Sequence, residues 1–214
     1  MSSKEGLFVK TRQRLGLFAF TVISGGILTC SLTGMASATT YYVSPSGSDS
    51  SIGTSSAPFR TIQRAANVVN PGDTVIVKSG VYTDTNGDGA IVSFQRGGTS
   101  GSWITFRSEN KWGAVLDGRN NATGYGLIFG SKANYVRVEN FELKGCAWGG
   151  IWSNSGAHHV YLYGNNIHHM GRRCTDTQYG QGMGAYQGTG TNYHTYDSNM
   201  IHDNGRFATG ENGC

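Results

Sequence analysis

The sequence has only 3 prolines in 214 residues, and charged residues make up 14% of it, well below the usual quarter. Scarce proline, with no glycine at every third position, excludes a collagen-like chain. Low charge together with 11% aromatic residues argues against intrinsic disorder, which requires many charges and few aromatic side chains. The cysteines form no C-x-x-C pair, so a structural zinc site is not indicated.

Glycine is abundant where proline and charge are scarce. The 33 glycines are about twice the usual share, and each one inside a helix costs about 1 kcal/mol relative to alanine. Long helices are therefore disfavoured, and the composition predicts a β-rich protein with many turns. We expect several glycines to lie at tight corners with positive φ. These are Gly126, Gly150, Gly171, Gly184 and Gly205.

The net charge of +4 is concentrated in the first 38 residues. Four bases lie there against a single acid, so the other 13 bases and 12 acids leave only +1. The excess of positive charge is thus a property of the N-terminus. It gives no reason to expect a nucleic-acid partner.

Residues 1–38 have the features of an export signal. An apolar run over 15–28 follows the basic stretch, and Ala36-Ser37-Ala38 is a small-x-small cleavage site. A membrane anchor is disfavoured because the run is shorter than the about 20 apolar residues of a span, and a lipoprotein modified at Cys30 is a further alternative. We predict a signal peptide over 1–38, no membrane contact after cleavage, and a secreted or cell-surface location.

Three cysteines remain after cleavage at this site: Cys146, Cys174 and Cys214. Export permits a disulfide, and an odd count leaves one thiol over. The sequence leaves the pairing open.

An internal repeat organises the second half of the chain. Residues 135–145 (YVRVENFELKG), 159–169 (HVYLYGNNIHH) and 193–203 (YHTYDSNMIHD) align without gaps at offsets of 24 and 34 residues. Apolar residues alternate, as in a strand with one buried face, and then slip by one, as at a corner between strands. A coil of about 24 residues fits one turn of a parallel β-helix. A β-sandwich, the alternative, would need hairpin turns every 8 to 12 residues or so.

Two further features fit the coil. Asn165 and Asn199 share one inward corner position, where stacked asparagines can hydrogen-bond along the coil axis. The ten extra residues of the second unit fall in 171–182, and such insertions form loops on one face.

The N-terminal part differs from the repeats. Residues 61–69 have apolar side chains at helical spacing, residues 70–73 form a turn, and residues 74–77 read as a strand. We predict an N-terminal cap over 39–73, whose helix covers the end of the coil and blocks edge-to-edge pairing. The β-helix repeats then occupy 74–214.

Several segments resemble the N-terminal cap of pectate-lyase-like right-handed parallel β-helix proteins. They are 41–49 (YYVSPSGSD), 58–63 (PFRTIQ), 71–75 (PGDTV), 80–82 (GVY) and 98–105 (GTSGSWIT), the last resembling the link into their first full turns. The resemblance implies an all-β fold, a single-stranded right-handed parallel β-helix (solenoid) with an N-terminal capping helix. It also implies further turns after residue 214.

The resemblance is specific for the fold and weak for the reaction. The family includes pectate, alginate and chondroitin lyases, epimerases, hydrolases and non-catalytic members. In its lyases, calcium-binding acids and a basic catalytic residue sit on mid-coil turns. No family-specific catalytic motif is matched in this sequence.

Stacked repeats place Lys144, His168 and His202 in one outward column, with neighbouring turns about 4.8 Å apart. Removing a proton next to a uronate carboxylate requires a base and a stabilising positive charge. We therefore regard these three as candidate catalytic residues, with Arg172 and Arg206 binding the carboxylate. The alternative is that the two histidines are turn residues that satisfy backbone groups.

Two metal sites are conceivable. His169 and Asp203 occupy the next column and, with the neighbouring histidines, offer ligands for a metal ion. Residues 84–89 (DTNGDG) match the start of a calcium loop, but Gln95 stands where a bidentate glutamate is expected. A plain turn is favoured there, and calcium is the one cofactor that we consider.

Outward aromatic side chains are the remaining signal. Tyr161 and Tyr163 face solvent if their neighbours in the strand face inward, Arg137 shares the column of Tyr161, and Trp152 lies near the 171–182 loop. Flat rings can stack on sugar faces, so we predict that these four residues bind substrate. Strand propensity alone also enriches aromatic residues.

Two functions remain open. The first is an exported lyase that cleaves a uronate-containing polysaccharide by β-elimination. The alternative is a non-catalytic carbohydrate-binding or cell-surface structural β-helix protein. An extracellular or cell-wall polysaccharide is the expected partner in both cases.

Overall fold

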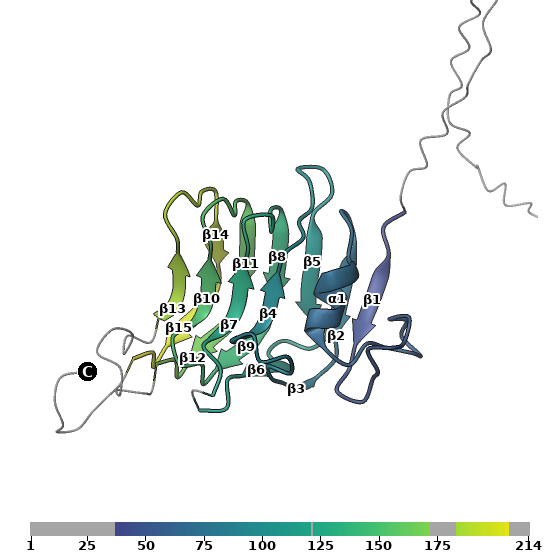
Figure 1. Ribbon diagram of the computed structural model, residues 1–214, viewed down its shortest axis with the longest axis horizontal. Coiled ribbons are helices and arrows are strands. Elements are labelled where there is room, and N and C mark those ends of the chain that lie inside the picture. The colour runs from purple at the N-terminus through teal and green to yellow at the C-terminus, as the bar shows by residue number, and fades with distance from the viewer. Residues whose placement is uncertain (1–36, 121, 172–182, 206–214) are drawn as a thin grey trace, which may run out of the picture. The chain divides into compact units, whose positions relative to one another are not determined.

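The computed structural model describes residues 37–120, 122–171 and 183–205. Their strands form three sheets that run side by side along the molecule (Figure 1). Sheet A contains β1 (Thr40–Val43), β2 (Thr74–Val77), β5 (Ile104–Ser108), β8 (Val136–Glu139), β11 (Val160–Tyr163) and β14 (Thr195–Asp197). Sheet B contains β3 (Gly80–Tyr82), β6 (Ala114–Asp117), β9 (Glu142–Lys144), β12 (Asn166–His168) and β15 (Met200–His202). Sheet C contains β4 (Ala90–Phe94), β7 (Tyr125–Phe129), β10 (Gly149–Ser153) and β13 (Met183–Gln187).

The chain visits sheets A, B and C in turn and then starts the next coil. Every pair of neighbouring strands in these sheets is parallel, which identifies a parallel β-helix and excludes the hairpin-built β-sandwich. The predicted offsets of 24 and 34 are confirmed, because Val160 pairs with Val136 and Tyr161 with Thr195. Earlier coils have other offsets: Thr74 pairs with Thr105 and Ile104 with Val136. Comparison of ungapped segments could not reveal those coils.

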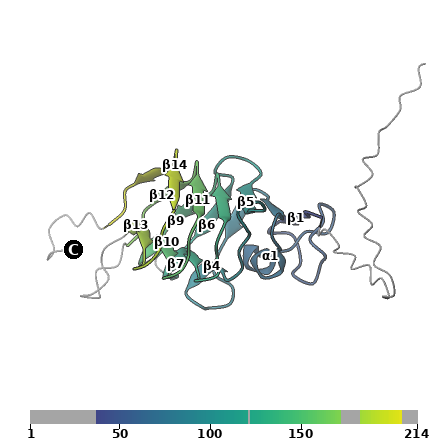
Figure 2. The same cartoon turned by 90° about the horizontal axis from the view of Figure 1, so that it is seen from above.

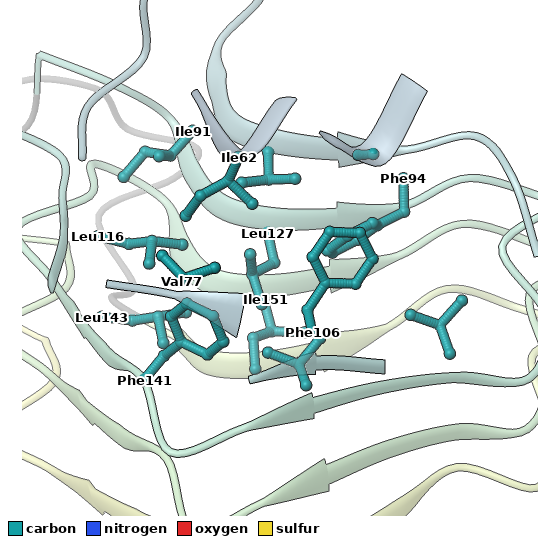
Figure 3. Close-up of a cluster of buried hydrophobic side chains, with 14 of the residues drawn as sticks. Ile62, Val77, Ile91, Phe94, Phe106, Leu116, Leu127, Phe141, Leu143 and Ile151 are labelled. Atoms are coloured by element: carbon teal, nitrogen blue, oxygen red, sulfur yellow. The ribbon is translucent and has the colours of Figure 1, made fainter. Parts of the chain in front are cut away.

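The core is a set of inward columns, one residue from each coil. Phe94 stacks on Phe129 with ring centroids 4.9 Å apart and meets Phe106 edge to face at 4.9 Å. Aliphatic columns fill the rest of the interior, and Figure 3 shows several of their members. They include Leu116, Leu143 and Ile167 from sheet B and Leu127 and Ile151 from sheet C.

A buried asparagine holds the corner between sheets A and B. Asn165 is 1% exposed, and its Oδ1 accepts the N–H of Phe141 at 2.9 Å. Its Nδ2 donates to the carbonyl of Val138 and to Oδ1 of Asn199, both at 3.0 Å. The predicted stacking of Asn165 on Asn199 is therefore confirmed, and it joins three coils through one side chain.

Left-handed residues recur at the corners. Three sets, each related by the offsets of 24 and 34, have φ between 49° and 70°. They are Tyr135, His159 and Tyr193; Asn140, Gly164 and Ser198; and Gly145, His169 and Asp203. The coil thus turns at fixed positions that tolerate several residue types, although left-handed backbone costs a residue other than glycine about 1 kcal/mol.

The predicted role of glycine is only partly right. Gly171 and Gly205 do have positive φ, but Gly126 and Gly150 lie within strands β7 and β10, and Gly184 within β13. At Gly126 the requirement is close approach, because a Cβ there would lie 2.6 Å from the carbonyl oxygen of Gly150 in the next coil.

Helix α1 (Ile62–Val68) continues the row of sheet C strands beyond β4 (Figure 2). The side chain of Thr61 caps it by accepting the N–H of Arg64. Gln63 pairs with the edge of β4 as a strand would: its Oε1 accepts the N–H of Ser93 at 2.7 Å and its Nε2 donates to the same residue's carbonyl at 3.0 Å. The predicted helix therefore satisfies an edge that would otherwise invite another strand. No helix in the described ranges has the length and apolar character needed to cross a membrane.

Cys146 is a buried free thiol among the described residues, and burial raises its pKa to about 12. Cys174 and Cys214, the other two cysteines that could form a disulfide, lie outside the described residues. Residues 1–36 of the predicted signal peptide and most of the 171–182 insertion also lie outside them.

Replacing Asn165 by alanine tests the corner. We expect Asn165→Ala to lower the free energy of unfolding by about 2–4 kcal/mol, because the buried N–H of Phe141 and carbonyl of Val138 both lose the hydrogen bond from this side chain. Urea denaturation measures the loss. The matched control is Asn166→Ala, whose half-buried side chain bonds His202 and no other side chain in the described ranges and whose cost should stay below about 1 kcal/mol. Equal losses in the two variants would contradict the role given to Asn165.

Candidate active site

The last residues of successive sheet B strands form one outward column. The strand register joins Asp117 to Lys144, Lys144 to His168, and His168 to His202. These side chains point outward because the residue before each of the first three, Leu116, Leu143 and Ile167, is at most 1% exposed. The predicted register of the Lys144–His168–His202 column is confirmed, and Asp117 extends it by one coil.

A cleft of about 500 Å³ opens beside this column, at the corner between sheets B and C. It is lined by Asp117, Arg119, Asn120, Lys144, Gly145, His168 and His169. Gly145 helps to keep it open, because a Cβ there would lie 3.2 Å from Oδ1 of Asp117 and 3.3 Å from the N atom of Asn120. The cleft therefore gathers two cations, one carboxylate and two imidazoles.

Glu142 organises the polar side chains next to the cleft. Its Oε1 lies 3.2 Å from Nε2 of His168 and 3.4 Å from Nζ of Lys144. Nδ1 of His168 in turn lies 2.6 Å from Nδ1 of His169. The side chain of His168 is 13% exposed, whereas that of Lys144 is 37% exposed.

Burial lowers the pKa of His168 below its usual 6.5, and the neighbouring His169 and His202 act in the same direction. The carboxylate of Glu142 opposes this shift without overcoming it. His168 is therefore neutral at pH 7 and carries one ring proton. A carboxylate only accepts hydrogen bonds, so we assign that proton to Nε2, which donates to Glu142.

This assignment fixes the role of the neighbouring imidazole. Nδ1 of His168 then accepts the N–H at Nδ1 of His169, which leaves Nε2 of His169 as a proton acceptor. Both nitrogens of His168 are engaged within the protein. His168 is thus better placed to orient His169 than to react itself.

His202 and Asp203, from the predicted catalytic and metal sets, lie one coil further on. His202 stacks on His168 with ring centroids 5.1 Å apart, and its Nδ1 lies 2.8 Å from Oδ2 of Asp203. The hydrogen bond from His202 lowers the pKa of Asp203. Asp203 and His169 thus each have a histidine partner already. No group of three or more His, Cys, Asp or Glu side chains suited to a metal occurs within the described ranges.

The possible calcium loop is closed by its own backbone. Oδ1 of Asp84 accepts the N–H of Gly87 at 2.8 Å and that of Asn86 at 3.1 Å. Asp88 likewise accepts the N–H of Ala90 at 3.1 Å. These bonds are those of Asx turns, and a calcium requirement of the protein stays a prediction.

The predicted substrate-binding residues do not line the cleft. Arg137, Tyr161 and Tyr163 lie on the outward side of sheet A, and Trp152 lies on β10 of sheet C. The ring of Trp152 contacts that of Tyr125, which also contacts Trp148. Arg172 and Arg206, the predicted carboxylate-binding arginines, lie outside the described residues.

Four polar residues of this site were missed by the repeat comparison: Asp117, Arg119, Asn120 and Glu142. Asp117 belongs to a coil whose offset to the next is 27 residues rather than 24, so ungapped alignment passed over it. The recurrence of Leu116-Asp117-Gly118 as Leu143-Lys144-Gly145 was the signal that could have found it. Glu142 gave no signal because its role depends on side-chain contact between coils.

Comparison with known proteins identifies the family. Residues 41–213 match the family described as Pel9A-like, right handed beta helix region. The chain belongs to this Pel9A-like family. Membership also confirms the right-handed coil implied by the sequence resemblance, and no residue role follows from it.

Individual relatives cover less of the chain. The uncharacterised protein YwoF of Bacillus subtilis (strain 168) is 37% identical over 81 residues, 38% of this chain and 16% of that protein. Pectate lyase L of Dickeya chrysanthemi is 34% identical over 87 residues, 40% of this chain and 20% of that enzyme. A solved rhamnogalacturonan lyase matches with a TM-score of 0.51 at 23% identity, over 62% of this chain and 36% of its own. This structural likeness shows the shared fold, and the matched region is a fifth or less of each of the two sequence relatives.

Removing the charge of Glu142 tests the network. We expect Glu142→Gln to lower the pKa of His168 further, because the carboxylate is the group that favours the imidazolium. The ¹H NMR titration of the ring between about pH 4 and pH 8 measures the pKa. Glu139→Gln, on the outward side of sheet A, should leave it unchanged. An unchanged or raised pKa in Glu142→Gln would contradict the assigned contact.

Proposed function

We propose that this member of the Pel9A-like family acts on a uronate-containing polysaccharide outside the cell and cleaves it by β-elimination in the cleft beside sheet B. The family, and the pectate lyase among its relatives, support activity on a polysaccharide. The apolar run and small-x-small site of residues 1–38 support export.

The observation that carries the proposal is the set of groups gathered by the cleft. β-Elimination removes the proton on the carbon next to the uronate carboxylate, and the electron pair forms a carbon–carbon double bond as the glycosidic C–O bond breaks. The departing oxygen takes up a proton. The reaction needs a base, positive charge to stabilise the developing carbanion, and room for a sugar. Arg119, Lys144 and His169 supply the first two, and the cleft supplies the third.

The geometry divides these tasks. His169 is the base in this proposal, because its Nε2 is the proton acceptor left by the hydrogen bond to His168. His168 is a positioning residue, held by Glu142. Lys144, paired with Glu142 at 3.4 Å, and the exposed Arg119 face the substrate carboxylate, and the guanidinium offers it a bidentate contact.

One observation favours the alternative of a non-catalytic binding protein. The aromatic rings of Tyr125, Trp148 and Trp152 cluster on the outward side of sheet C, with neighbouring centroids 5.3 Å apart. Trp148 is 40% exposed, and such rings stack on sugar faces. Retention on a polysaccharide without turnover, weakened by Trp152→Ala, would support this function.

A glycan panel tests the catalytic proposal. The protein is incubated with pectate, alginate and glycosaminoglycans, with calcium and with a chelator, and the unsaturated product is followed by its ultraviolet absorbance. We expect turnover of one uronate polymer, and a loss of about 100-fold or more in His169→Ala, as is usual for removal of a general base. Lys144→Ala should lower kcat similarly, because it removes charge from the transition state.

Lys132→Ala is the matched control, since this exposed lysine lies in the corner between sheets C and A, outside the cleft, and it should keep full activity. Absence of product from the wild-type protein on every polymer would overturn the lyase proposal. Full activity in both His169→Ala and Lys144→Ala would move the reaction away from this cleft.

A further inference from the structure

The outward side of sheet A carries an arginine between two aromatic rings. Trp103, Arg137 and Tyr161 come from three successive coils, since Thr105 pairs with Arg137 and Arg137 with Tyr161. The Cζ atom of Arg137 lies 4.9 Å from the ring centroid of Trp103 and 5.0 Å from that of Tyr161. Both contacts are within cation–π range, so the guanidinium is flanked by a ring in the coil before and a ring in the coil after.

The two rings are themselves held in place. Trp103 meets Tyr135 edge to face at 5.4 Å. Tyr161 donates its O–H to Oδ2 of Asp197 at 2.8 Å and lies parallel to Tyr163, at 6.2 Å between centroids and 7° between planes. The hydrogen bond to Tyr161 lowers the pKa of Asp197, which therefore stays ionised and keeps accepting it. The position of Arg137 is thus fixed before any ligand arrives.

The N–H edge of Arg137 remains available. Within the described part of the chain its guanidinium forms no hydrogen bond and no ion pair, although Glu139 follows two residues later on the same strand. Asp197, which lies two coils further on, is engaged by Tyr161 and Ser198. A guanidinium that lies between two rings and has no hydrogen-bond or ion-pair partner among the described residues suits a planar carboxylate, which it binds through two parallel N–H···O bonds.

An exposed ring lies on the same outward side of sheet A, one outward position along from the Arg137–Tyr161 pair. Tyr163 is 39% exposed. It follows Tyr161 by two residues on strand β11 and therefore points to the same side of sheet A. Its face offers apolar area for a sugar ring while the sugar hydroxyls stay in water. A charged fork beside a flat ring is what a carboxylate-bearing sugar requires.

We propose that the outward side of sheet A, centred on Arg137 and Tyr163, is a glycan-binding surface that holds a uronate residue of an acidic polysaccharide, separate from the cleft beside sheet B. The surface would keep the polymer on the protein between turnovers or, in a non-catalytic protein, provide the binding itself. The proposal extends the function proposed above and does not depend on catalysis in the cleft.

Binding of defined oligosaccharides tests it. Hexagalacturonate, its carboxyl-reduced neutral form and an alginate hexamer are titrated into the intact protein by calorimetry, without calcium. We expect one of the acidic hexamers to bind at least about tenfold more tightly than the neutral one. Arg137→Gln should lose about tenfold in affinity for it. Arg137→Lys should lose most of the same, because an ammonium keeps the charge and lacks the planar fork.

Arg107→Gln is the matched control. It removes the same charge from the neighbouring strand β5, where Arg107 is exposed and pairs in register with Glu139. We expect it to keep the wild-type affinity. Urea denaturation of each variant establishes that it is folded.

Several outcomes would overturn the proposal. Equal weakening by Arg107→Gln and Arg137→Gln would indicate attraction by net charge alone. Equal affinity for the acidic and neutral hexamers, or binding of neither acidic hexamer, would exclude a carboxylate site. Binding lost in Lys144→Ala and kept in Arg137→Gln would assign the glycan to the cleft. Turnover by the wild-type protein, together with unchanged oligosaccharide affinity in Arg137→Gln, would leave the lyase proposal intact and overturn this one.

Discussion

The in-register parallel pairing of successive coils is the constraint on which the rest of this structure depends. Each strand pairs with the strands one coil before and one coil after. The backbone N–H and C=O groups of a coil's strands are therefore hydrogen-bonded by the neighbouring coils and not within the coil. Side chains therefore stack in columns about 4.8 Å apart. Inward columns make the core of phenylalanine and aliphatic side chains, and α1 closes the row of sheet C by giving β4 the amide of Gln63 in place of a strand.

Corners follow from the same constraint. The chain must change direction at the same places in every coil, so left-handed residues recur at equivalent positions, occupied by tyrosine, histidine, asparagine, serine, aspartate or glycine. Where a corner buries polar backbone, a side chain must satisfy it, and Asn165 does so for Phe141 and Val138. A strained corner and a buried amide are tolerated because neighbouring coils hold both in place.

Stacking also creates chemistry from residues that are far apart in the sequence. Glu142 and His168 meet across one coil boundary. Burial keeps His168 neutral, and its contacts with Glu142 and His169 leave His169 with a proton acceptor beside the cleft. Trp103, Arg137 and Tyr161 meet across two boundaries on another side of the coil. The same register therefore builds a reactive cleft on one sheet and a rigid, charged aromatic surface on a second.

The sequence by itself determined the coil, because offsets of 24 and 34 are properties of the chain and the register follows from them. It determined the Lys144–His168–His202 column and the Asn165–Asn199 stack for the same reason, and the capping helix through the helical spacing of apolar residues in 61–69. Only the tertiary structure decided which side chains within and between columns touch. Glu142 on His168, Asp117 in the cleft, and Arg137 between two rings depend on rotamers and on coils of unequal length, and a linear pattern contains neither. Strand glycines such as Gly126 were misread because close approach between coils, like turning, favours a residue without a side chain.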